Sequence, residues 1–400
     1  MKSNHPFAAR ALLASLAALA TLAAAPQKGP QGQRGPGVPE FWVRPGFKVT
    51  LAAENFGQSR FLVTAPDGTL FVSQPDAGSI TALRDIDGDG VYETKSKVLE
   101  GRRYVHGMQI DGDWLYFTTT GAVSRAKLPS EGAPLADIQT VIPEGEVPSG
   151  GGHWWRSILV HNGKLWTSIG DSGNITDEAT TDRQKIWHFD VGQDGRATNK
   201  KLWATGIRNT EKLMLRPGTP EVWGCDHGSD NLGARYGEKG GGPITDVFPP
   251  CEFNHYVDGF NYGHPFVTGL GLPRPEYANR ADILQKVEAN TPPELSFGAH
   301  WAPNGWTFLN GDGLLGKSGD ALIAFHGSWN ARRKVGYRVE RVFFDDVTGR
   351  PMGSQKLVGT LDVSGEEVLG RPCDLVELPD GSVLFTDNGT SRIYRISRVK

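Results

Sequence analysis

The sequence predicts an all-β fold, a six-bladed β-propeller built from four-stranded antiparallel blades. One hairpin pattern, consisting of a strand, a glycine-bearing turn and a second strand, recurs six times along the chain. The 400 residues include 52 glycines and 26 prolines, a composition typical of many short strands joined by tight turns. Long stretches with the 3.6-residue period of a helix are missing outside the N-terminus, which argues against a helical bundle.

The six hairpins follow one another at similar intervals. They begin at Arg60, Val105, Trp155, Thr210, Asn304 and Arg371. The intervals are 45, 50, 55, 94 and 67 residues, and the long fourth interval predicts an insertion over about residues 231–300. Further strand candidates follow the hairpins, such as GSITALRD from Gly78 and GYRVERVFF from Gly336, so each unit offers about four strands. Six such units around an axis form a propeller, with a β-sandwich or two smaller β-domains as the alternatives.

A propeller ring commonly closes when an N-terminal strand completes the last blade. FKVTLAAE (Phe47 to Glu54) is well placed to pair beside SRIYRISR (Ser391 to Arg398). The propeller is therefore expected to span residues 41–400, with the N-terminal strand closing the last blade.

The N-terminus precedes the fold. Residues 1–25 have the pattern of a signal peptide, with Lys2 and Arg10 ahead of an Ala/Leu run that is too short and too weakly apolar for a membrane span. Residues 26–40, rich in Gly, Pro and Gln, are expected to form a flexible leader. We therefore expect an exported protein, periplasmic or secreted, without a membrane span in the mature chain; a retained N-terminal anchor is the alternative.

Charge and cysteine content restrict the partners and the cross-links. The formal net charge of −3 provides no global field favouring nucleic acid or a membrane surface. The three cysteines are an odd number, which forbids a complete disulfide framework, and a pairing of Cys225 with Cys251 is left open.

The hairpin geometry predicts where polar residues gather. In a propeller the first strand of each blade lines the central channel, so the open ends of all six hairpins meet on one face around the axis. The polar residues at these ends are His106, His153, Arg156, Arg208, Asn209, Asn304 and Arg371 ahead of first strands, and Asp171, Asp226 to Asp230, His326 to Ser328, Asp387 and Asn388 behind second strands. Neighbouring glycines let the backbone approach a ligand closely. One polar mouth is therefore expected.

Cations in this set suit a small polyanionic ligand. Arg208, Arg371 and the run NARRKVGY, which includes Lys334, could clamp several carboxylates, because a guanidinium pairs with a carboxylate in a two-pronged manner. The alternative is that these cations are solvated or ion-paired at the surface. This alternative applies more to the NARRKVGY run than to Arg208, whose sequence neighbours are apolar.

A histidine and a loop add further chemistry. His153 is a candidate general base, because an unperturbed imidazole titrates near neutrality; a structural histidine packed near Trp154 and Trp155 is the alternative. The loop CDHGSDNLG (Cys225 to Gly233) offers carbonyl and carboxylate oxygens of the kind that Ca²⁺ prefers, or it is simply a polar turn.

The segment DIDGDGVYETKS (Asp85 to Ser96) starts like an EF-hand loop. Its twelfth position is Ser96, where a bidentate Glu is required, and no helices flank it. We therefore predict a hairpin turn, with a peripheral Ca²⁺ as the alternative.

Several of these segments together resemble the glucose/sorbosone dehydrogenase family, the soluble quinoprotein sugar dehydrogenases that use pyrroloquinoline quinone (PQQ). The resemblance covers about Phe41 to the C-terminus and is closest to the sorbosone-type branch. It is carried, in this order, by GGHWWRSILVHNGKLWTSIGD, GIRNTEKLMLRPGTPEVWGCDHGSD, FNYGHPF, AFHGSWNARRKVGYRV and GRPCDLVELPDGSVLFTDN.

The resemblance implies a six-bladed propeller with the quinone at the central mouth. His153 matches the catalytic base, and Arg208 with Asn209 matches the Arg-Asn pair that contacts the quinone, so that Arg208 also stabilises charge on it. The carbonyls of Gly228 and Ser229 match the ligands of the Ca²⁺ that the quinone helps to bind. Lys334 and Arg371 match further quinone-binding positions.

The chain also departs from the family pattern. The second arginine of the C-terminal motif is replaced by Cys373, and the region around His106 lacks a glutamine that contacts sugar and quinone. These changes weaken the expectation of glucose as substrate and of tight quinone retention. The resemblance still implies a dehydrogenase that takes a sugar or sugar-derived aldehyde or alcohol and passes electrons to an unidentified acceptor. A non-catalytic propeller binding glycan or protein, and a Ca²⁺-dependent lactonase-like propeller, are the alternatives.

Overall fold

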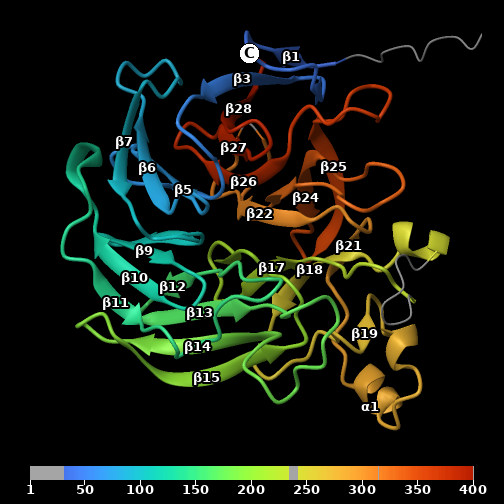
Figure 1. Ribbon diagram of the computed structural model, residues 1–400. Coiled ribbons are helices and arrows are strands. Elements are labelled where there is room, and N and C mark those ends of the chain that lie inside the picture. Colours follow the sequence, from blue (N-terminus) through green and yellow to red (C-terminus); the bar gives the residue numbers. More distant parts are fainter. Residues whose placement is uncertain (1–30, 234–241, 314, 400) are drawn as a thin grey trace, which may run out of the picture.

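The computed structural model describes residues 31–233, 242–313 and 315–399, and it confirms the six-bladed β-propeller (Figure 1). Blade 1 contains β4 (Leu62–Thr64), β5 (Leu70–Gln74), β6 (Ser79–Arg84) and β7 (Thr94–Leu99). Blade 2 contains β8 (Met108–Asp111), β9 (Trp114–Thr118), β10 (Val123–Lys127) and β11 (Gln139–Ile142). Blade 3 contains β12 (Leu159–His161), β13 (Lys164–Ile169), β14 (Lys185–Val191) and β15 (Ala197–Thr205).

The second half of the ring has the same plan. Blade 4 contains β16 (Leu213–Leu215), β17 (Val222–Asp226), β18 (Cys251–Tyr256) and β21 (Leu295–Phe297). Blade 5 contains β22 (Pro303–Phe308), β23 (Ala321–Phe325), β24 (Arg338–Phe344) and β25 (Pro351–Gly359), with β2 (Trp42–Val43) at its edge. Blade 6 contains β26 (Pro372–Glu377), β27 (Val383–Asp387), β28 (Arg392–Arg398), β3 (Phe47–Ala53) and β1 (Gln33–Arg34). Each predicted hairpin forms the first two strands of one blade.

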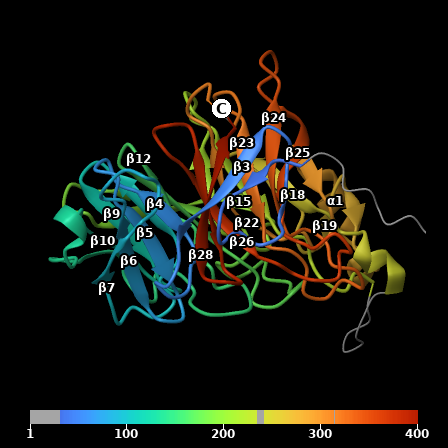
Figure 2. The same ribbon diagram turned by 90° about the horizontal axis from the view of Figure 1, so that it is seen from above.

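The N-terminal strand closes the ring, as the sequence predicted. β3 pairs antiparallel with β28, in a register that sets Phe47 opposite Arg398 and Ala53 opposite Ile393. Figures 1 and 2 show the blue β3 lying beside the red β28. The two ends of the propeller are therefore joined by backbone hydrogen bonds within one sheet.

Part of the expected flexible leader is instead a strand. Residues 1–30, including the predicted signal peptide, lie outside the described residues, but Gln33 and Arg34 form β1, which pairs parallel with β3. The edge of β3 offers unpaired backbone groups, and backbone pairing does not depend on the Gly- and Pro-rich composition on which the prediction rested. In the described part of the chain, no helix is long and apolar enough to cross a membrane.

The expected insertion at residues 231–300 is interrupted by the propeller itself. β18 and β21 both fall in this range and are the outer strands of blade 4. The remaining short elements are η2 (Gly242–Asp246), β19 (Val267–Thr268), β20 (Leu272–Pro273), η3 (Pro275–Tyr277) and α1 (Ile283–Glu288), while η1 (Ser130–Gly132) links β10 to β11. Figure 1 shows α1 and β19 outside the ring, beside blade 4.

Apolar layers between the blades hold the ring together. Between blades 4 and 5, Trp223 and Trp306 are fully buried together with Phe253 and Phe308. Burial of one such side chain contributes about 1.5–3 kcal/mol. Cys225, Cys251 and Cys373 are buried free thiols, so the pairing left open by the sequence is absent.

Candidate active site

The tight turns point away from the mouth and leave the polar ends of the hairpins at the axis. In blade 3, Asn162 and Gly163 both have positive φ values, 50° and 70°, which suits the two-residue turn between β12 and β13. His153 precedes β12 and Asp171 follows β13, so both lie at the open end of this hairpin. The same arrangement in all six blades produces one central mouth.

A buried ion pair lies at the centre of the mouth. Arg60, ahead of β4, and Glu211, ahead of β16, are in contact, with Nη2 2.6 Å from Oε2 and side chains 6% and 2% exposed. His106 Nε2 of blade 2 lies 3.5 Å from the same carboxylate oxygen. With its amide oriented to satisfy its neighbours, Asn304 of blade 5 accepts a hydrogen bond from Arg60 at 2.8 Å. Four blades thus meet at the axis.

The ionisation of Glu211 follows from these contacts. Burial disfavours the charged carboxylate, but Arg60 and His106 overcome it and hold the pKa of Glu211 well below its usual range. Glu211 therefore stays charged beside Arg60 across the physiological pH range.

His153 is held in one tautomer. Its Nδ1 lies 3.1 Å from the backbone carbonyl of Asp171, which can only accept, so Nδ1 carries the proton and Nε2 keeps a free lone pair. Burial and the nearby charge of Arg208 lower the pKa of His153 to about 3. The imidazole is therefore neutral and able to accept a proton near neutral pH.

Asp171 links His153 to Arg208. The Asp171 N–H donates to the Arg208 carbonyl at 2.9 Å, and the Asp171 carbonyl accepts from the His153 N–H at 3.2 Å. The neighbouring Gly170 permits this approach, because a Cβ there would lie 2.6 Å from the Arg208 oxygen and 2.7 Å from the His153 Cβ. The structure thus brings the two predicted residues to the same side of the ring.

A histidine from the segment between β18 and β21 of blade 4 completes this arrangement. His264 Nε2 lies 2.7 Å from Asp171 Oδ2, and the carboxylate also accepts from the Gly173 N–H at 2.6 Å. These bonds hold the pKa of Asp171 below its usual range despite burial. FNYGHPF, which contains His264, therefore fixes the residue that orients His153.

Arg208 is fixed by four hydrogen bonds. Its guanidinium donates to the carbonyl and side-chain oxygens of Asn174, at 3.0 and 2.7 Å, to the Gly228 carbonyl at 3.1 Å and to Asp230 Oδ2 at 3.1 Å. Asn209 follows it, with Nδ2 3.2 Å from Glu211 Oε1. Arg208 and Asn209 therefore connect the His153 side of the mouth to the central ion pair.

The predicted cations of the last blades lie in different surroundings. Arg371 Nη1 is 3.3 Å from His326 Nδ1, and its Nη2 donates to the Tyr337 hydroxyl at 3.2 Å. Burial, with the charges of Arg60 and Arg371, lowers the pKa of His326 to about 3, so this imidazole is neutral and accepts from Arg371. Lys334 is exposed and donates to the Glu366 carbonyl, without a described contact to the groups around His153.

The two tryptophans expected near His153 pack against each other. Their ring centroids are 3.8 Å apart in a stacked arrangement, and the Arg60 guanidinium carbon lies 3.8 Å from the centre of the Trp155 ring. Tyr104 packs on Trp154 at 4.6 Å. This aromatic layer, from the segments ahead of blades 2 and 3, packs against Arg60 of the central ion pair.

The mouth has the chemistry for an anionic aromatic cofactor. Arg60 Nε is buried without a hydrogen-bond partner, and Arg371 is only partly buried and paired with neutral groups. Unsatisfied donors of this kind are typical of a site that a ligand completes. PQQ, a planar tricarboxylate, fits this donor set.

The predicted site at Gly228 and Ser229 could hold Ca²⁺ only together with a bound ligand. Two backbone carbonyls are fewer than the six to eight oxygens that Ca²⁺ takes, and the Gly228 carbonyl already accepts one bond from Arg208. A cation here needs further oxygens from a bound molecule. A Cβ at Gly228 would lie 2.5 Å from the Pro250 carbonyl, so close packing explains the glycine.

The other acidic segment forms the turn expected from its sequence. Four acidic residues lie between β6 and β7, and each offers an oxygen within 4.8 Å of the others: Asp85, Asp87, Asp89 and Glu93. In the described ranges this is the one group of three or more potential metal ligands of the His, Cys, Asp and Glu types, and it lies on an outer turn, not on the axis.

The sequence reasoning missed Arg60, Glu211 and His264. Arg60 opens the first hairpin and Glu211 stands just before β16, so the rule that selected the other mouth residues also applies to these two. His264 had no such signal, because it reaches the mouth from outside the repeated hairpins.

Together the fold and the mouth define a class: propellers whose axial mouth combines a neutral histidine with several arginines. The chain belongs to the TrAA12-like family, whose model matches residues 41–265 and 248–363. This confirms the family relationship indicated by the motifs.

Solved structures with the same fold cover nearly the whole propeller. A carbohydrate-active enzyme of family AA12 from Trichoderma reesei is 20% identical, with a TM-score of 0.77 over 91% of this chain and 98% of its own. The PQQ domain of pyranose dehydrogenase from Coprinopsis cinerea, in holo form, is 17% identical, with a TM-score of 0.78 over 91% and 100%. The soluble aldose sugar dehydrogenase of Escherichia coli is 17% identical, with a TM-score of 0.64 over 88% and 100%.

A relative of unassigned function matches part of the chain. It is an uncharacterised protein of Borreliella burgdorferi, 29% identical over 250 residues, and the match spans 61% of this chain and 60% of the relative's length.

Proposed function

We propose that the protein is a PQQ-dependent oxidoreductase that oxidises a sugar, or a sugar-derived aldehyde or alcohol, by hydride transfer to the quinone. The observation that carries this proposal is the fixed, neutral His153 with a free Nε2, tied through Asp171 to Arg208 at the axial mouth. Membership of the TrAA12-like family supports it, as does the shared fold with a PQQ-binding pyranose dehydrogenase domain and a soluble aldose sugar dehydrogenase.

His153 acts as the general base in this proposal. Its Nε2 accepts the proton of the substrate hydroxyl while the carbon bearing that hydroxyl loses hydride. When bound, PQQ supplies the hydride acceptor, a function that no side chain provides, and Ca²⁺ supplies positive charge beside it. An aldose leaves as a lactone, and a hydrated aldehyde leaves as an acid.

The arginines hold and polarise the cofactor. Arg208, oriented by its bonds to Asn174 and Asp230, would stabilise negative charge on a quinone oxygen. Asn209 and Arg371 would bind cofactor oxygens, and the carbonyls of Gly228 and Ser229 would be ligands of the Ca²⁺. Lys334 could bind the cofactor only after breaking its hydrogen bond to the Glu366 carbonyl.

A turnover assay tests the proposal. Purified protein with added PQQ and CaCl₂ should reduce an artificial dye when given aldoses, polyols or sugar aldehydes, and should be inactive without PQQ. If a broad panel of these compounds gives no dye reduction although the protein binds PQQ, the protein is not a sugar dehydrogenase. A non-catalytic binding module would show that result.

We also propose that the chain is exported, to the periplasm or the outside of the cell, on the basis of the signal-peptide pattern in residues 1–25. N-terminal sequencing of the protein from the extracytoplasmic fraction should find a start near residue 26. A chain that keeps Met1 and remains inside the cell contradicts this.

A further inference from the structure

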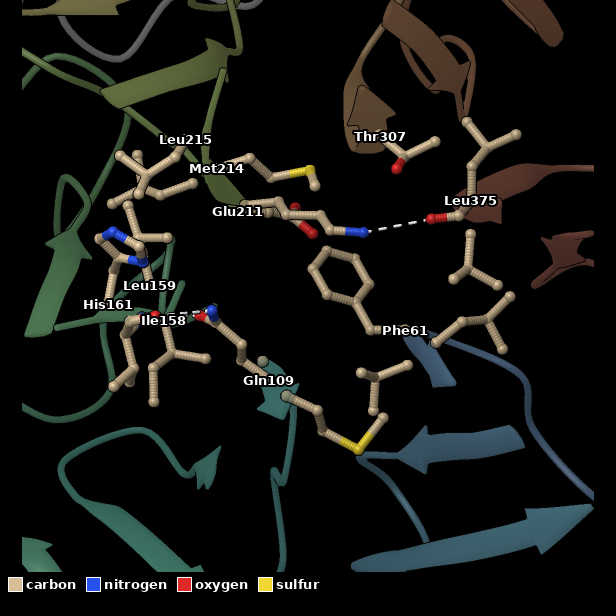
Figure 3. A pocket seen from close by; sticks show the side chains of 18 of the residues that line it. Phe61, Gln109, Ile158, Leu159, His161, Glu211, Met214, Leu215, Thr307 and Leu375 are labelled. Carbon is tan, nitrogen blue, oxygen red and sulfur yellow. Dashed lines mark hydrogen bonds between the residues drawn. The ribbon is translucent and has the colours of Figure 1, made fainter. Parts of the chain in front are cut away.

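A cavity borders the central ion pair, with Glu211 in its lining. It has a volume of about 380 Å³ and is bounded by first strands of the blades and by Gly218 and Thr219 of the β16–β17 turn. Figure 3 shows part of its lining, with Phe61, Gln109, Glu211, Met214 and Leu375 among the labelled side chains. Because the hairpin turns lie opposite the mouth, this axial channel extends from Glu211 toward the turn face of the propeller.

The walls of the axial channel are apolar, and its polar groups are mostly satisfied. Gln109 donates to the Val160 carbonyl at 2.8 Å and accepts from the Val160 N–H at 2.7 Å, which joins blades 2 and 3 and uses both ends of the amide. Leucine, isoleucine, methionine and phenylalanine side chains make up much of the remaining wall. Ligand sites of 300–1,000 Å³ have this composition, an apolar lining with a few placed polar groups.

Lys212, a cation in the lining of the axial channel, has donor capacity left. The Lys212 ammonium carries three hydrogens and donates to Asp374 Oδ1 at 2.7 Å and to the Leu375 carbonyl at 3.3 Å, the latter dashed in Figure 3. Its nitrogen lies 5.8 Å from the centre of the Phe61 ring. The third hydrogen is available to an acceptor on a bound molecule.

The charges around this donor cancel in pairs. Lys212 is paired with the fully buried Asp374, and Arg60 with Glu211. Arg216, the other cation of the lining, lies 3.8 Å from Glu221. A charged ligand would therefore meet no net opposite charge in an apolar channel, and its desolvation would be uncompensated. The occupant that fits is neutral and carries one hydrogen-bond acceptor.

We propose that the axial channel is a second binding site, for a neutral aromatic carbonyl compound whose oxygen accepts a hydrogen bond from Lys212. Its ring packs against Phe61 and against the thioethers of Met108 and Met214, which favour aromatic contacts. None of the residues proposed to hold PQQ lines the axial channel, so binding there does not require the proposed PQQ site.

Two probes that differ only at the acceptor test the chemistry. The full chain should bind 2-acetonaphthone, a neutral aromatic ketone whose fluorescence reports its surroundings, about tenfold more tightly than 2-ethylnaphthalene, because a hydrogen bond from a charged donor is worth that factor or more. Equal affinity for the two probes, or no saturable binding of the ketone, overturns the proposal.

A matched pair of methionine variants tests the location. Met214→Trp fills the axial channel and should weaken ketone binding at least tenfold, whereas Met352→Trp, at a 64% exposed methionine on β25, should leave it unchanged. Thermal unfolding checks that both variants are folded. Equal effects of the two variants, or displacement of the ketone by saturating PQQ and Ca²⁺, places the probe outside the axial channel and overturns the proposal.

Discussion

The environment of His153 changes both properties that decide how an imidazole reacts. The Asp171 carbonyl fixes the proton on Nδ1, and burial beside Arg208 moves the pKa to about 3. A base with so low a pKa is weak in equilibrium terms, but it is available at every pH above about 4. A substrate held against its free nitrogen meets a neutral acceptor at all times, and Arg208 discourages protonation by solvent.

Replacing His153 should separate chemistry from binding. In His153→Gln we expect a loss of about 10²–10⁴ in kcat, the usual contribution of a general base, with PQQ affinity within about threefold of the parent. His161→Gln, at an exposed histidine on the turn face, is the control and should keep full activity. Equal losses of turnover and of PQQ binding in His153→Gln would reassign His153 to cofactor binding.

The pH profile of kcat/KM carries a second signature of His153. Because its pKa is lowered to about 3, protonation of this group should not reduce kcat/KM between pH 7 and pH 5. An unperturbed histidine would cause a tenfold fall per pH unit below about 6.5. Initial rates with a dye whose reduction is independent of pH measure kcat/KM on the acid side of the profile. A fall of kcat/KM below about pH 6.5 that is absent in His153→Gln would contradict the low pKa of His153.

The buried Arg60–Glu211 pair is expected to contribute to the stability of the fold. Glu211→Gln leaves a buried guanidinium without its counter-charge, and we expect the free energy of unfolding to fall by about 3–5 kcal/mol. Removal of the exposed Lys97–Glu100 pair should cost less than about 1 kcal/mol. Urea unfolding compares the two. Similar small losses for both would show that Arg60 finds other partners or water.

At the scale of the strand and turn, glycine positions decide how closely neighbouring segments approach. Gly170→Ala places a methyl group 2.6 Å from the Arg208 carbonyl and 2.7 Å from the His153 Cβ, so we expect His153 to move and turnover to fall at least tenfold. Gly311→Ala has open space around the new Cβ and serves as the control. Activity measured at saturating PQQ distinguishes them; full activity in Gly170→Ala contradicts the tight junction described for blade 3.

The repeated hairpins are the part of the fold that the sequence predicts well. Asn162-Gly163 marks a turn, alternation marks the strands on either side, and six repetitions define the ring. Two features had no local signal. β1 forms because the edge of β3 accepts it, and β18 with β21 belongs to blade 4 although long segments interrupt that blade. Both depend on what lies beside them in space.

Only part of the candidate site could be predicted from the sequence. His153, Arg208, Asn209 and Gly228 stand at hairpin ends, and the structure brings them together. The prediction for Lys334 rests on similarity in a less regular loop, and the Lys334 amine donates to the Glu366 carbonyl. His264 contacts Asp171 from a segment outside the repeated hairpins. No sequence pattern predicts its position at the mouth, so only the folded structure reveals its role.

At the scale of the whole molecule, buried neutral histidines make stability depend on pH. The pKa values of His153 and His326 are lowered to about 3 and that of His264 to about 4, chiefly by burial. Between pH 6.5 and about 4 the unfolded chain binds these protons and the folded chain does not. Stability therefore rises with pH in that window, by about 1.4 kcal/mol per pH unit for each group. Glu252, with its pKa raised to about 8 by burial, has the opposite slope from pH 4.5 to 8.

A substitution isolates one of these groups. His326→Gln keeps a side chain that can accept from Arg371 and donate to Asn388, but it cannot titrate. The variant should lose less stability than the parent when the pH falls from 6.5 to 4.5, as measured by urea unfolding at several pH values. Identical slopes for variant and parent would mean that His326 is protonated in the folded state as readily as in the unfolded state.

The proposed cofactor site depends on one mouth formed by residues from separate blades. The most direct measurement is an equilibrium titration of the metal-free full chain with PQQ, with and without Ca²⁺, followed by the absorbance of the quinone. Saturable binding of one PQQ per chain, strengthened by Ca²⁺ and weakened at least tenfold in both Arg208→Gln and Arg371→Gln, is the expected result. Absence of saturable binding, or binding indifferent to both arginines, would contradict the assignment of the axial mouth as the cofactor site.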